Sequence, residues 1–287
     1  MNSNDSCVIL SGYSCDKKYR LRDEKGNAIL IREFEKDSPE RVSEIFELMK
    51  LLDKHNIPMS KPVQCILSPE KRIIRQMWLP GKTLREFGQT ASKIELASYG
   101  RRAGKLLKAI HSIPVSSDMA WNTYFSQQID RKVRDYMSCG VQLQNDRALI
   151  SYISQNTNLI KDRPLSLVHG DYHVDNMIVG DDGSLSIIDF DSCSYADPWK
   201  DFDRLFVCAA FSPIFARELV TGYFDNHIPT QFWKVCSFYS ACKILSWISW
   251  ASRFDDSRIC VILDLAKNAM LWNNDFQMDR PAWFDQK

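Results

Sequence analysis

The stretch HGDYHVDNMIVGDDGSLSIIDFD, residues 169–191, decides the fold class of this 287-residue chain. Its polar residues fall at set intervals: Asn176 follows Asp171 by five positions, and Asp189 follows Asn176 by thirteen. Apolar runs on either side of the turn at 181–183 predict a β-hairpin. Because a hairpin brings its two outer ends together, we expect Asn176 and Asp189 at one end of a small sheet, beside Asp171.

These residue types suit phosphoryl transfer. The reaction needs a carboxylate that orients the attacking hydroxyl and accepts its proton, oxygen ligands that hold Mg²⁺ against the phosphates, and cations that cover the developing charge. Mg²⁺ prefers carboxylate and amide oxygens, so Asn176 and Asp189 are chemically suitable ligands. The alternative interpretation is that these are turn carboxylates and a capping Asn on solvated loops.

The pattern HGD-x4-N followed by IDFD resembles the aminoglycoside phosphotransferase family, relatives of choline kinases and more distantly of eukaryotic protein kinases. Protein kinases carry HRD-x4-N and then DFG at the same intervals. By position, the resemblance implies that Asp171 is the catalytic base, that Asn176 and Asp189 are the magnesium ligands, and that His169 buttresses the catalytic loop. Asp191 stands where protein kinases have Gly and is a candidate helper near the metal.

The resemblance covers nearly the whole chain and implies an α+β, bilobal protein-kinase-like fold. It predicts a nucleotide-binding N-lobe at residues 1–79, with a small antiparallel sheet and one helix. A C-lobe at residues 80–287, larger and mostly helical, would carry the catalytic loop and bind the acceptor substrate. The Leu79-Pro80-Gly81 sequence is the expected hinge.

Local patterns agree with this division. In the N-lobe, Ser38-Pro39 and apolar residues at three-to-four spacing predict one helix, Ser38–His55. The DEKGN turn predicts a hairpin. The expected strands are Val8–Leu10, Lys18–Arg22, Ala28–Phe34, Val63–Leu67 and Arg72–Met77, and β segments at Leu165–His169, Asn176–Val179 and Leu185–Asp189 interrupt the C-lobe helices. Those helices are expected at Ser92–His111, Trp121–Cys139, Asp146–Leu159, Phe202–Phe211, Ile214–Tyr223, Thr230–Arg253 and Ser257–Asn273.

The nucleotide-holding residues are less clearly marked. The resemblance implies a strand-borne cation that touches the α- and β-phosphates and a helix Glu that pairs with it. The strand offers Arg32 where the family has lysine, and arginine can also hold phosphate. The Glu partner is either Glu44 or Glu47, with Glu44 preferred. An outward-facing Arg32 on an edge strand is the alternative.

Two further segments are expected to touch the nucleotide. In the loop between the first two strands, Ser11, Gly12 and Ser14 can present backbone N–H groups to phosphate oxygens. The resemblance places the base against the hinge residues Gln76, Met77 and Trp78. We therefore expect Mg²⁺ and ATP or GTP as cofactors.

Gly81-Lys82-Thr83 is similar to the end of a Walker A loop, but Gln76 stands where that motif needs Gly.

Composition excludes several other classes. Lys and Arg (37) nearly balance Asp and Glu (36), so no basic excess indicates a nucleic-acid partner. The nine cysteines show no CxxC and no metal spacing, which favours reduced thiols. No signal peptide is evident, and the apolar runs are too short to span a bilayer. We expect a cytoplasmic protein without a membrane partner, of open oligomeric state.

The acceptor is the least determined element. We expect a small-molecule hydroxyl, with an aminoglycoside or related antibiotic preferred, which would make the protein a resistance enzyme. The motif also suits kinases of metabolite alcohols of the choline, homoserine or sugar type, because one fold hosts many substrates. A protein kinase is disfavoured because no APE-like segment or long activation loop follows IDFD. A catalytically silent nucleotide-binding module is the remaining alternative, and Arg32 in place of lysine favours it.

Overall fold

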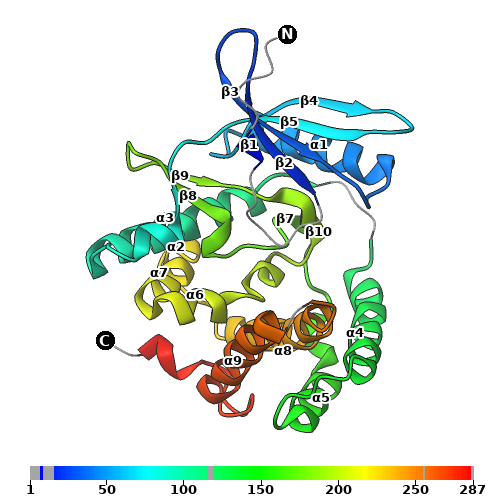
Figure 1. The fold of residues 1–287 in the computed structure, drawn as a ribbon. Helices are drawn as coiled ribbons and strands as arrows, with labels where there is room; N and C mark the ends of the chain where they lie inside the picture. Colours follow the sequence, from blue (N-terminus) through cyan, green and yellow to red (C-terminus); the bar gives the residue numbers. More distant parts are fainter. Residues whose placement is uncertain (1–6, 9–15, 116–118, 255, 286–287) are drawn as a thin grey trace. The chain divides into compact units, whose positions relative to one another are not determined.

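A computed structural model describes residues 7–8, 16–115, 119–254 and 256–285 (Figure 1). Contacts within the chain define an N-terminal unit, residues 1–87 and 175–193, and a C-terminal unit, residues 88–174 and 194–287. The N-terminal unit extends past the expected boundary at residue 79 because strand β6 (Lys82–Thr83) pairs with β8 (Met177–Val179). The expected split of nucleotide and acceptor binding between two lobes stays a prediction.

The N-terminal unit contains a five-stranded antiparallel sheet, visible in Figure 1. The predicted hairpin is confirmed, since Asp23 Oδ1 accepts from Asn27 N at 2.8 Å and Gly26 takes a φ of 81° in the turn. A positive φ is easiest for glycine because it lacks a Cβ. In sheet order the strands are β1 (Cys7–Val8), β2 (Lys17–Arg22), β3 (Ala28–Glu33), β5 (Arg72–Met77) and β4 (Pro62–Leu67).

Helix α1 (Pro39–Lys54) confirms the predicted N-lobe helix. Its first turn is capped by Ser38, whose Oγ accepts from Arg41 N at 3.3 Å, and Pro39 supplies a preset φ at the first position. The apolar residues recur on one face, and that face is buried. Its buried residues are Val42, Ile45, Leu48, Met49 and Leu52.

A second, three-stranded sheet in this unit has the order β6-β8-β9, with β9 at Leu185–Ile187. The close pairing requires glycine at position 81, because a Cβ there would lie 2.2 Å from Val179 O, and its φ is 131°. Gly81-Lys82-Thr83 is therefore a strand entry and not a phosphate loop. A short helix, α2 (Leu84–Gly88), follows directly.

The C-terminal unit is mostly helical, as predicted. Helix α8 is buried along most of its length and contacts α4, α5 and α9, which explains its nearly continuous apolar sequence. The expected helix at 146–159 ends earlier, at Gln155, and continues as a 3₁₀ turn, Thr157–Ile160. The helices are α3 (Lys93–His111), α4 (Trp121–Ser138), α5 (Asp146–Gln155), α6 (Leu205–Phe211), α7 (Pro213–Tyr223), α8 (Phe232–Ala251) and α9 (Asp256–Trp272).

Helices α3 and α7 pack with their backbones close together. A Cβ on Gly104 would lie 2.1 Å from Leu219 O, and one on Gly222 would lie 2.4 Å from Arg101 O. Glycine is therefore required at this crossing. Helix α3 begins with a capping box in which Ser92 and Glu95 satisfy each other's backbone N–H groups.

Two short elements of the C-terminal unit, β10 and η4, were not among the expected strands and helices. Strand β7 (Ser166–Val168), which was expected, pairs antiparallel with β10 (Ser194–Ala196), which was not. The 3₁₀ helix η4 (Pro198–Phe202) follows β10.

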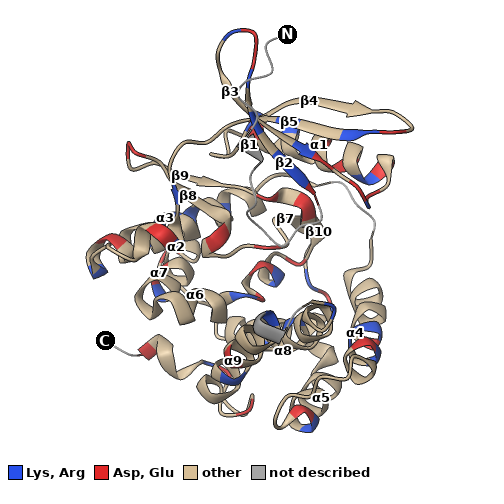
Figure 2. Ribbon diagram, in the orientation of Figure 1, with Lys and Arg blue, Asp and Glu red and all other residues tan. Residues whose placement is uncertain are grey.

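Basic and acidic residues are interspersed along α3, α4 and α9 (Figure 2). Among the described residues, no helix combines the length and apolar character needed to cross a bilayer.

Candidate active site

The hairpin of strands β8 and β9 brings Asn176 and Asp189 to the same end of the small sheet. Met177 pairs with Ile187, and Ile188 N donates to Asn176 O at 3.0 Å. Asn176 precedes β8 and Asp189 follows β9, so the convergence expected from the hairpin is confirmed for this pair. Asp171 belongs to the C-terminal unit, and its position relative to the pair stays a prediction.

Arg32 lies at the centre of a group of carboxylates in the N-terminal unit and does not face outward. Its side chain is only 4% exposed, and its Nη1 donates to Asp191 Oδ1 at 2.7 Å. Its Nη2 donates to a carboxylate oxygen of Asp191 and to one of Asp16, and Nη1 lies 3.7 Å from Asp189 Oδ1. Bidentate pairing of this kind suits the planar guanidinium better than it suits an ammonium.

The charges of this group do not balance. Burial acts to lower the pKa of Arg32, but Asp191, Asp189 and Asp16 outweigh it and raise that pKa. Burial raises the pKa of Asp191 against the effect of Arg32, and the neighbouring Asp189 raises it further. Three carboxylates around a single arginine leave an excess of negative charge, which is the environment that a cation would enter.

The donor atoms at this end of the hairpin fit Mg²⁺. The ion is usually held by one or two carboxylates and completes its shell with water and substrate phosphates, so a dedicated cage is not required. Among the described residues, no group of three or more His, Cys, Asp and Glu side chains could hold a metal by itself. The amide oxygen of Asn176 and the carboxylate of Asp189, 29% exposed, are the residues that would hold the ion.

Glu44 does not meet Arg32. It is exposed on α1, where its Oε2 accepts from Arg41 Nη1 at 2.7 Å. Glu47 pairs with Lys50 instead, and no ion pair in the described part of the chain joins either glutamate to Arg32. The lysine–glutamate pair that the resemblance implied is thus replaced by an arginine–aspartate network, since Asp191 and Asp16 occupy the guanidinium.

Arg41 provides a different link between α1 and the loop after β9. Its Nη2 donates to the backbone carbonyl of Asp191 and, at 3.1 Å, to that of Cys193. The helix therefore holds the Asp189–Asp191 segment through its backbone. Sequence reasoning missed this residue, because a surface arginine in the first turn of a helix carries no distinguishing signal.

The other expected nucleotide contacts divide into two groups. Ser11, Gly12 and Ser14 lie outside the described residues. In the hinge, Met77 N donates to Lys61 O, Met77 O accepts from Ser60 Oγ, and Trp78 N donates to Ala28 O. Gln76 is buried in β5. These backbone groups already form hydrogen bonds within the N-terminal unit. The role of the hinge in binding a base therefore stays a prediction.

In the C-terminal unit, Asp201 holds the loop that begins with His169 and Gly170 and leads to Asp171. Its carboxylate accepts from His169 N at 2.8 Å and from Gly170 N at 2.6 Å, and His111 Nε2 lies 3.0 Å away. Burial acts to raise the pKa of Asp201, but the hydrogen bond to His111 outweighs it and lowers that pKa. Asp201 is fully buried, so this residue positions the loop and does not meet substrate.

His169 supports the loop through a hydrogen bond to the backbone of Asp171. Its Nδ1 accepts from Asp171 N at 3.2 Å, and the ring is completely buried. The neighbouring Tyr172 is anchored by its hydroxyl, which donates to Ala103 O at 2.8 Å on α3. Together these bonds fix the backbone that carries the Asp171 side chain.

Asp171 is held as a carboxylate by Arg204 and His173 of its own unit. Arg204 Nη2 lies 2.6 Å from Asp171 Oδ1, and His173 Nε2 lies 3.4 Å from Oδ2. Burial acts to raise the pKa of Asp171, but Arg204 and His173 outweigh it and hold that pKa well below its usual range. Asp171 is therefore ionised at neutral pH, and its side chain keeps 21% exposure.

The DPWKDFDRL segment, residues 197–205, makes contacts that support the loop of Asp171. Asp197 caps η4 and accepts from Trp199 N at 2.9 Å. The same segment also supplies Asp201 to the loop and Arg204 to Asp171. A D-P-x-x-D pattern is typical of a helix cap, and it signals neither of these two contacts.

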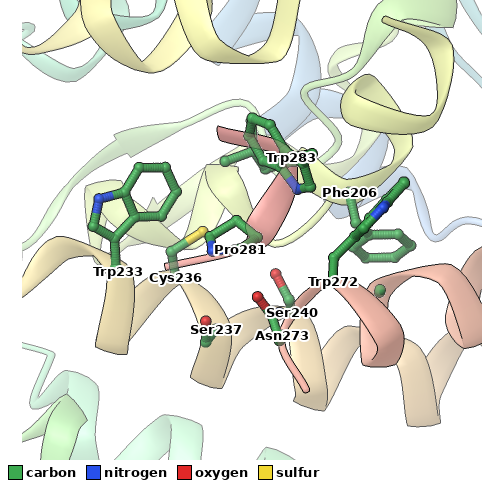
Figure 3. A pocket seen from close by; sticks show the side chains of 11 residues that line it. Phe206, Trp233, Cys236, Ser237, Ser240, Trp272, Asn273, Pro281 and Trp283 are labelled. Atoms are coloured by element: carbon green, nitrogen blue, oxygen red, sulfur yellow. The ribbon is translucent and has the colours of Figure 1, made fainter. Parts of the chain in front are cut away.

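A small cavity in the C-terminal unit does not qualify as an acceptor site. It lies among α8, α9 and the C-terminal segment (Figure 3), and its volume is about 20 Å³. That is space for about one water molecule. Asn273, at its wall, has a buried amide oxygen without a hydrogen-bond partner among the described residues, which such a water would satisfy.

The comparisons with known proteins agree with this geometry. The model of the phosphotransferase enzyme family, APH, matches residues 6–233. The match covers well over half of the chain, which therefore belongs to this family of kinase-like enzymes, and the resemblance inferred from HGD-x4-N and IDFD is confirmed. A search of curated proteins gave no match.

Solved structures confirm the α+β, protein-kinase-like fold. A choline/ethanolamine kinase family protein from Mesorhizobium loti has a TM-score of 0.71 at 15% identity, over 98% of this chain and 92% of that one. A thermostable mutant of the aminoglycoside phosphotransferase APH(4)-Ia has a TM-score of 0.70 at 13% identity, over 93% and 94%. The macrolide 2'-phosphotransferase from Brachybacterium faecium has a TM-score of 0.62 at 16% identity, over 92% and 93%.

Proposed function

We propose that this protein transfers the γ-phosphoryl group of ATP or GTP to a hydroxyl of a small molecule. The observation that carries the proposal is the fixed and ionised state of Asp171, whose loop is held by Asp201 and His169 and whose carboxylate is paired with Arg204. A structural turn carboxylate would need no such support. Family membership and solved relatives in complex with AMP-PNP or ADP support a nucleotide donor.

In the proposed reaction the acceptor hydroxyl oxygen forms a bond to the γ-phosphorus. The bond from that phosphorus to the β–γ bridging oxygen breaks, and the nucleoside diphosphate leaves. Asp171 orients the hydroxyl and accepts its proton as the new bond forms. A carboxylate of lowered pKa is a weak base, but a loose transition state needs orientation more than early proton removal.

Residues of the N-terminal unit would hold the donor. Asn176 and Asp189 would hold Mg²⁺, which would supply positive charge to offset that of the phosphates. Arg32, kept permanently charged, would face the α- and β-phosphates in the role that a lysine has in the family. Ser11, Gly12, Ser14 and the hinge residues Gln76, Met77 and Trp78 complete this proposal. The triphosphate donor makes the cytoplasm the expected compartment.

The acceptor is either an antibiotic, an aminoglycoside above all, or a metabolite alcohol. Similar structures include kinases of both kinds, such as the choline/ethanolamine kinase family protein and the macrolide phosphotransferase. Fold alone does not choose between them.

The test is nucleotide turnover with Mg²⁺ in the wild type, Asp171→Asn and the matched control Asp162→Asn. Asp162 is an exposed loop residue of the same unit with a φ of 55°, which Asn tolerates. Mass spectrometry of hydroxylated antibiotics and metabolites identifies the phosphorylated product. We expect Asp171→Asn to lose about 10²–10⁴-fold in rate and the control to lose none. Equal rates in all three proteins would contradict the proposal.

A second candidate, a silent nucleotide-binding module, is favoured by one observation. Both Nη atoms of Arg32 are occupied by Asp191 and Asp16, which leaves less of this cation for phosphate. Binding of Mg²⁺–nucleotide without phosphorylation of any acceptor, and without slow nucleotide hydrolysis, would establish this alternative.

A further inference from the structure

The C-terminal unit gathers four cations around two carboxylates, those of Asp171 and Asp203. They lie where α4 and α8 meet the segment from η4 to α6. We call this group the cationic cluster. Its members are Lys132 on α4, Lys200 in η4, Asp203 and Arg204 before α6, Lys243 on α8, and Asp171 itself. Four cations thus share two carboxylates.

The carboxylates of the cluster are too few and too distant to neutralise it. Lys200 Nζ and Lys243 Nζ lie 3.9 and 4.0 Å from the same oxygen, Asp203 Oδ2. Lys132 Nζ instead donates to a neutral group, Ser246 Oγ, at 3.1 Å. Asp171 is already paired with Arg204 at 2.6 Å. The lysine ammonium groups therefore keep most of their capacity for an anion.

Partial burial makes this excess of positive charge costly to the fold. The side chains of Lys200, Lys243 and Arg204 are only 21%, 16% and 15% exposed. The guanidinium of Arg204 stacks 4.9 Å from the Trp247 ring, and its buried Nε has no hydrogen-bond partner among the described residues. Partly buried cations without matching anions destabilise a fold. Burial accordingly lowers the pKa of both Lys132 and Lys243.

We propose that the cationic cluster binds the acceptor, and that this acceptor is an alcohol carrying an anionic group, a carboxylate or a phosphate. The inference rests on the proposed phosphotransfer at Asp171. An anion beside Lys132, Lys200 and Lys243 would supply the missing charge and hold the alcohol near the carboxylate that orients its hydroxyl. A polycationic aminoglycoside or a quaternary ammonium alcohol would instead meet like charge, which costs affinity.

The experiment uses two sets of related alcohols whose members carry a neutral, anionic or ammonium group. One set is glycerol, glycerate, glycerol 3-phosphate and 3-amino-1,2-propanediol. The other is glucose, gluconate, glucose 6-phosphate and glucosamine. Each compound is tested for phosphate gain by mass spectrometry and for competition with slow nucleotide hydrolysis by the full chain. We expect at least one anionic member to react or to compete about tenfold more effectively than its neutral and ammonium counterparts.

The two anionic arms separate the sources of negative charge, since glycerate and gluconate carry carboxylates and the esters carry phosphates. Preference for neutral or ammonium members, or no advantage of any anionic member, would overturn the inference. Transfer to a neutral or ammonium alcohol would leave the proposed function intact. The absence of any nucleotide turnover or Mg²⁺–nucleotide binding would remove the proposed function as well.

Two lysine variants test whether the cationic cluster causes the preference for anionic alcohols. Lys243→Gln and Lys200→Gln are expected to raise the KM or inhibition constant of the anionic compound about tenfold, and to leave the KM for nucleotide unchanged. Lys267→Gln, on an exposed lysine of α9, is the control. If the nucleotide KM rises instead, the cluster serves the triphosphate and the inference is wrong. Lys200 is the more exposed of the two substituted lysines, so its variant provides a second, independent test.

Discussion

The two units carry charged centres of opposite sign. In the N-terminal unit, Asp16, Asp189 and Asp191 surround Arg32, which leaves an excess of negative charge. In the C-terminal unit, four cations surround Asp171 and Asp203. A negative centre with oxygen donors suits a divalent cation, and a positive, partly buried centre suits an anion.

The difference between the two centres shows which charged residues belong to the family motif and which do not. The negative centre consists of motif residues and their partners, and its chemistry follows from the reaction that the family shares. Most of the positive centre comes from Lys132, Lys200, Arg204 and Lys243, which lie outside HGD-x4-N and IDFD. Residues of this kind can vary with the acceptor, and they are therefore where specificity is expected to reside.

The largest effect is expected from neutralising the negative centre. Asp189→Asn should lower kcat roughly 10³-fold, because several kcal/mol of charge stabilisation by the metal are lost. Its free energy of unfolding should not fall, since one of three clustered carboxylates loses its charge. Kinetics at varied Mg²⁺ and urea unfolding measure the two quantities. Asp181→Asn, at the exposed turn of the same hairpin, is the control, and a loss of stability with unchanged kcat would contradict the assignment.

Removing the cation of the same centre should act on stability. Arg32→Met leaves three carboxylates without their partner and is expected to cost about 3–5 kcal/mol in the free energy of unfolding. Arg32→Lys should cost less, because the charge remains but the bidentate pairing is lost. Urea unfolding measures both, with exposed Lys25→Met as the control. A Lys variant as unstable as the Met variant would show that geometry, and not charge, holds the centre together.

A smaller effect is expected from substituting Asp201, which supports the loop of Asp171 in the C-terminal unit. Asp201→Asn weakens charge-assisted hydrogen bonds to His169 N and Gly170 N, each worth about 1.5–3 kcal/mol. We expect a lower melting temperature and a lower kcat with the nucleotide KM unchanged. Thermal unfolding and steady-state kinetics test this, with exposed Asp264→Asn as the control. A raised nucleotide KM with normal kcat would disprove the positioning role.

The smallest effect is a pH dependence of the positive centre. Burial, assisted by Arg204, lowers the pKa of Lys243 to about 8 against the opposing effect of Asp203 and Asp171. In the unfolded chain the pKa of this amine is about 10.4. Between pH 8 and 10 the unfolded state therefore binds more protons than the folded state. The contribution of Lys243 to stability therefore rises with pH in this window, and its charge penalises the fold below it.

Thermal unfolding of wild type and Lys243→Gln between pH 7 and 10 measures this contribution. The variant should have its largest advantage at pH 7 and lose it towards pH 10. Lys267→Gln should show no such change. A constant difference between wild type and Lys243→Gln across the range would mean that the amine is not perturbed.

Local sequence patterns were enough to predict the local elements and the family. Ser38-Pro39 and the apolar spacing predicted α1, DEKGN predicted the β2–β3 hairpin, and turn 181–183 predicted the pairing that unites Asn176 with Asp189. These results depend on contacts between residues close in the chain, where propensity and periodicity carry the information. The spacing from His169 to Asp189 identified the family for the same reason.

Which charged side chains meet could not be predicted from these local patterns. The pairing of Arg32 with Asp191, 159 positions away, replaced the expected contact with Glu44. Arg204 and Lys243 come to Asp171 from segments that no local pattern relates to it. Ion pairs between distant segments depend on how helices and strands pack, and a sequence pattern of period 2 or 3.6 holds no information on that packing. The sign of charge around each centre follows from that packing.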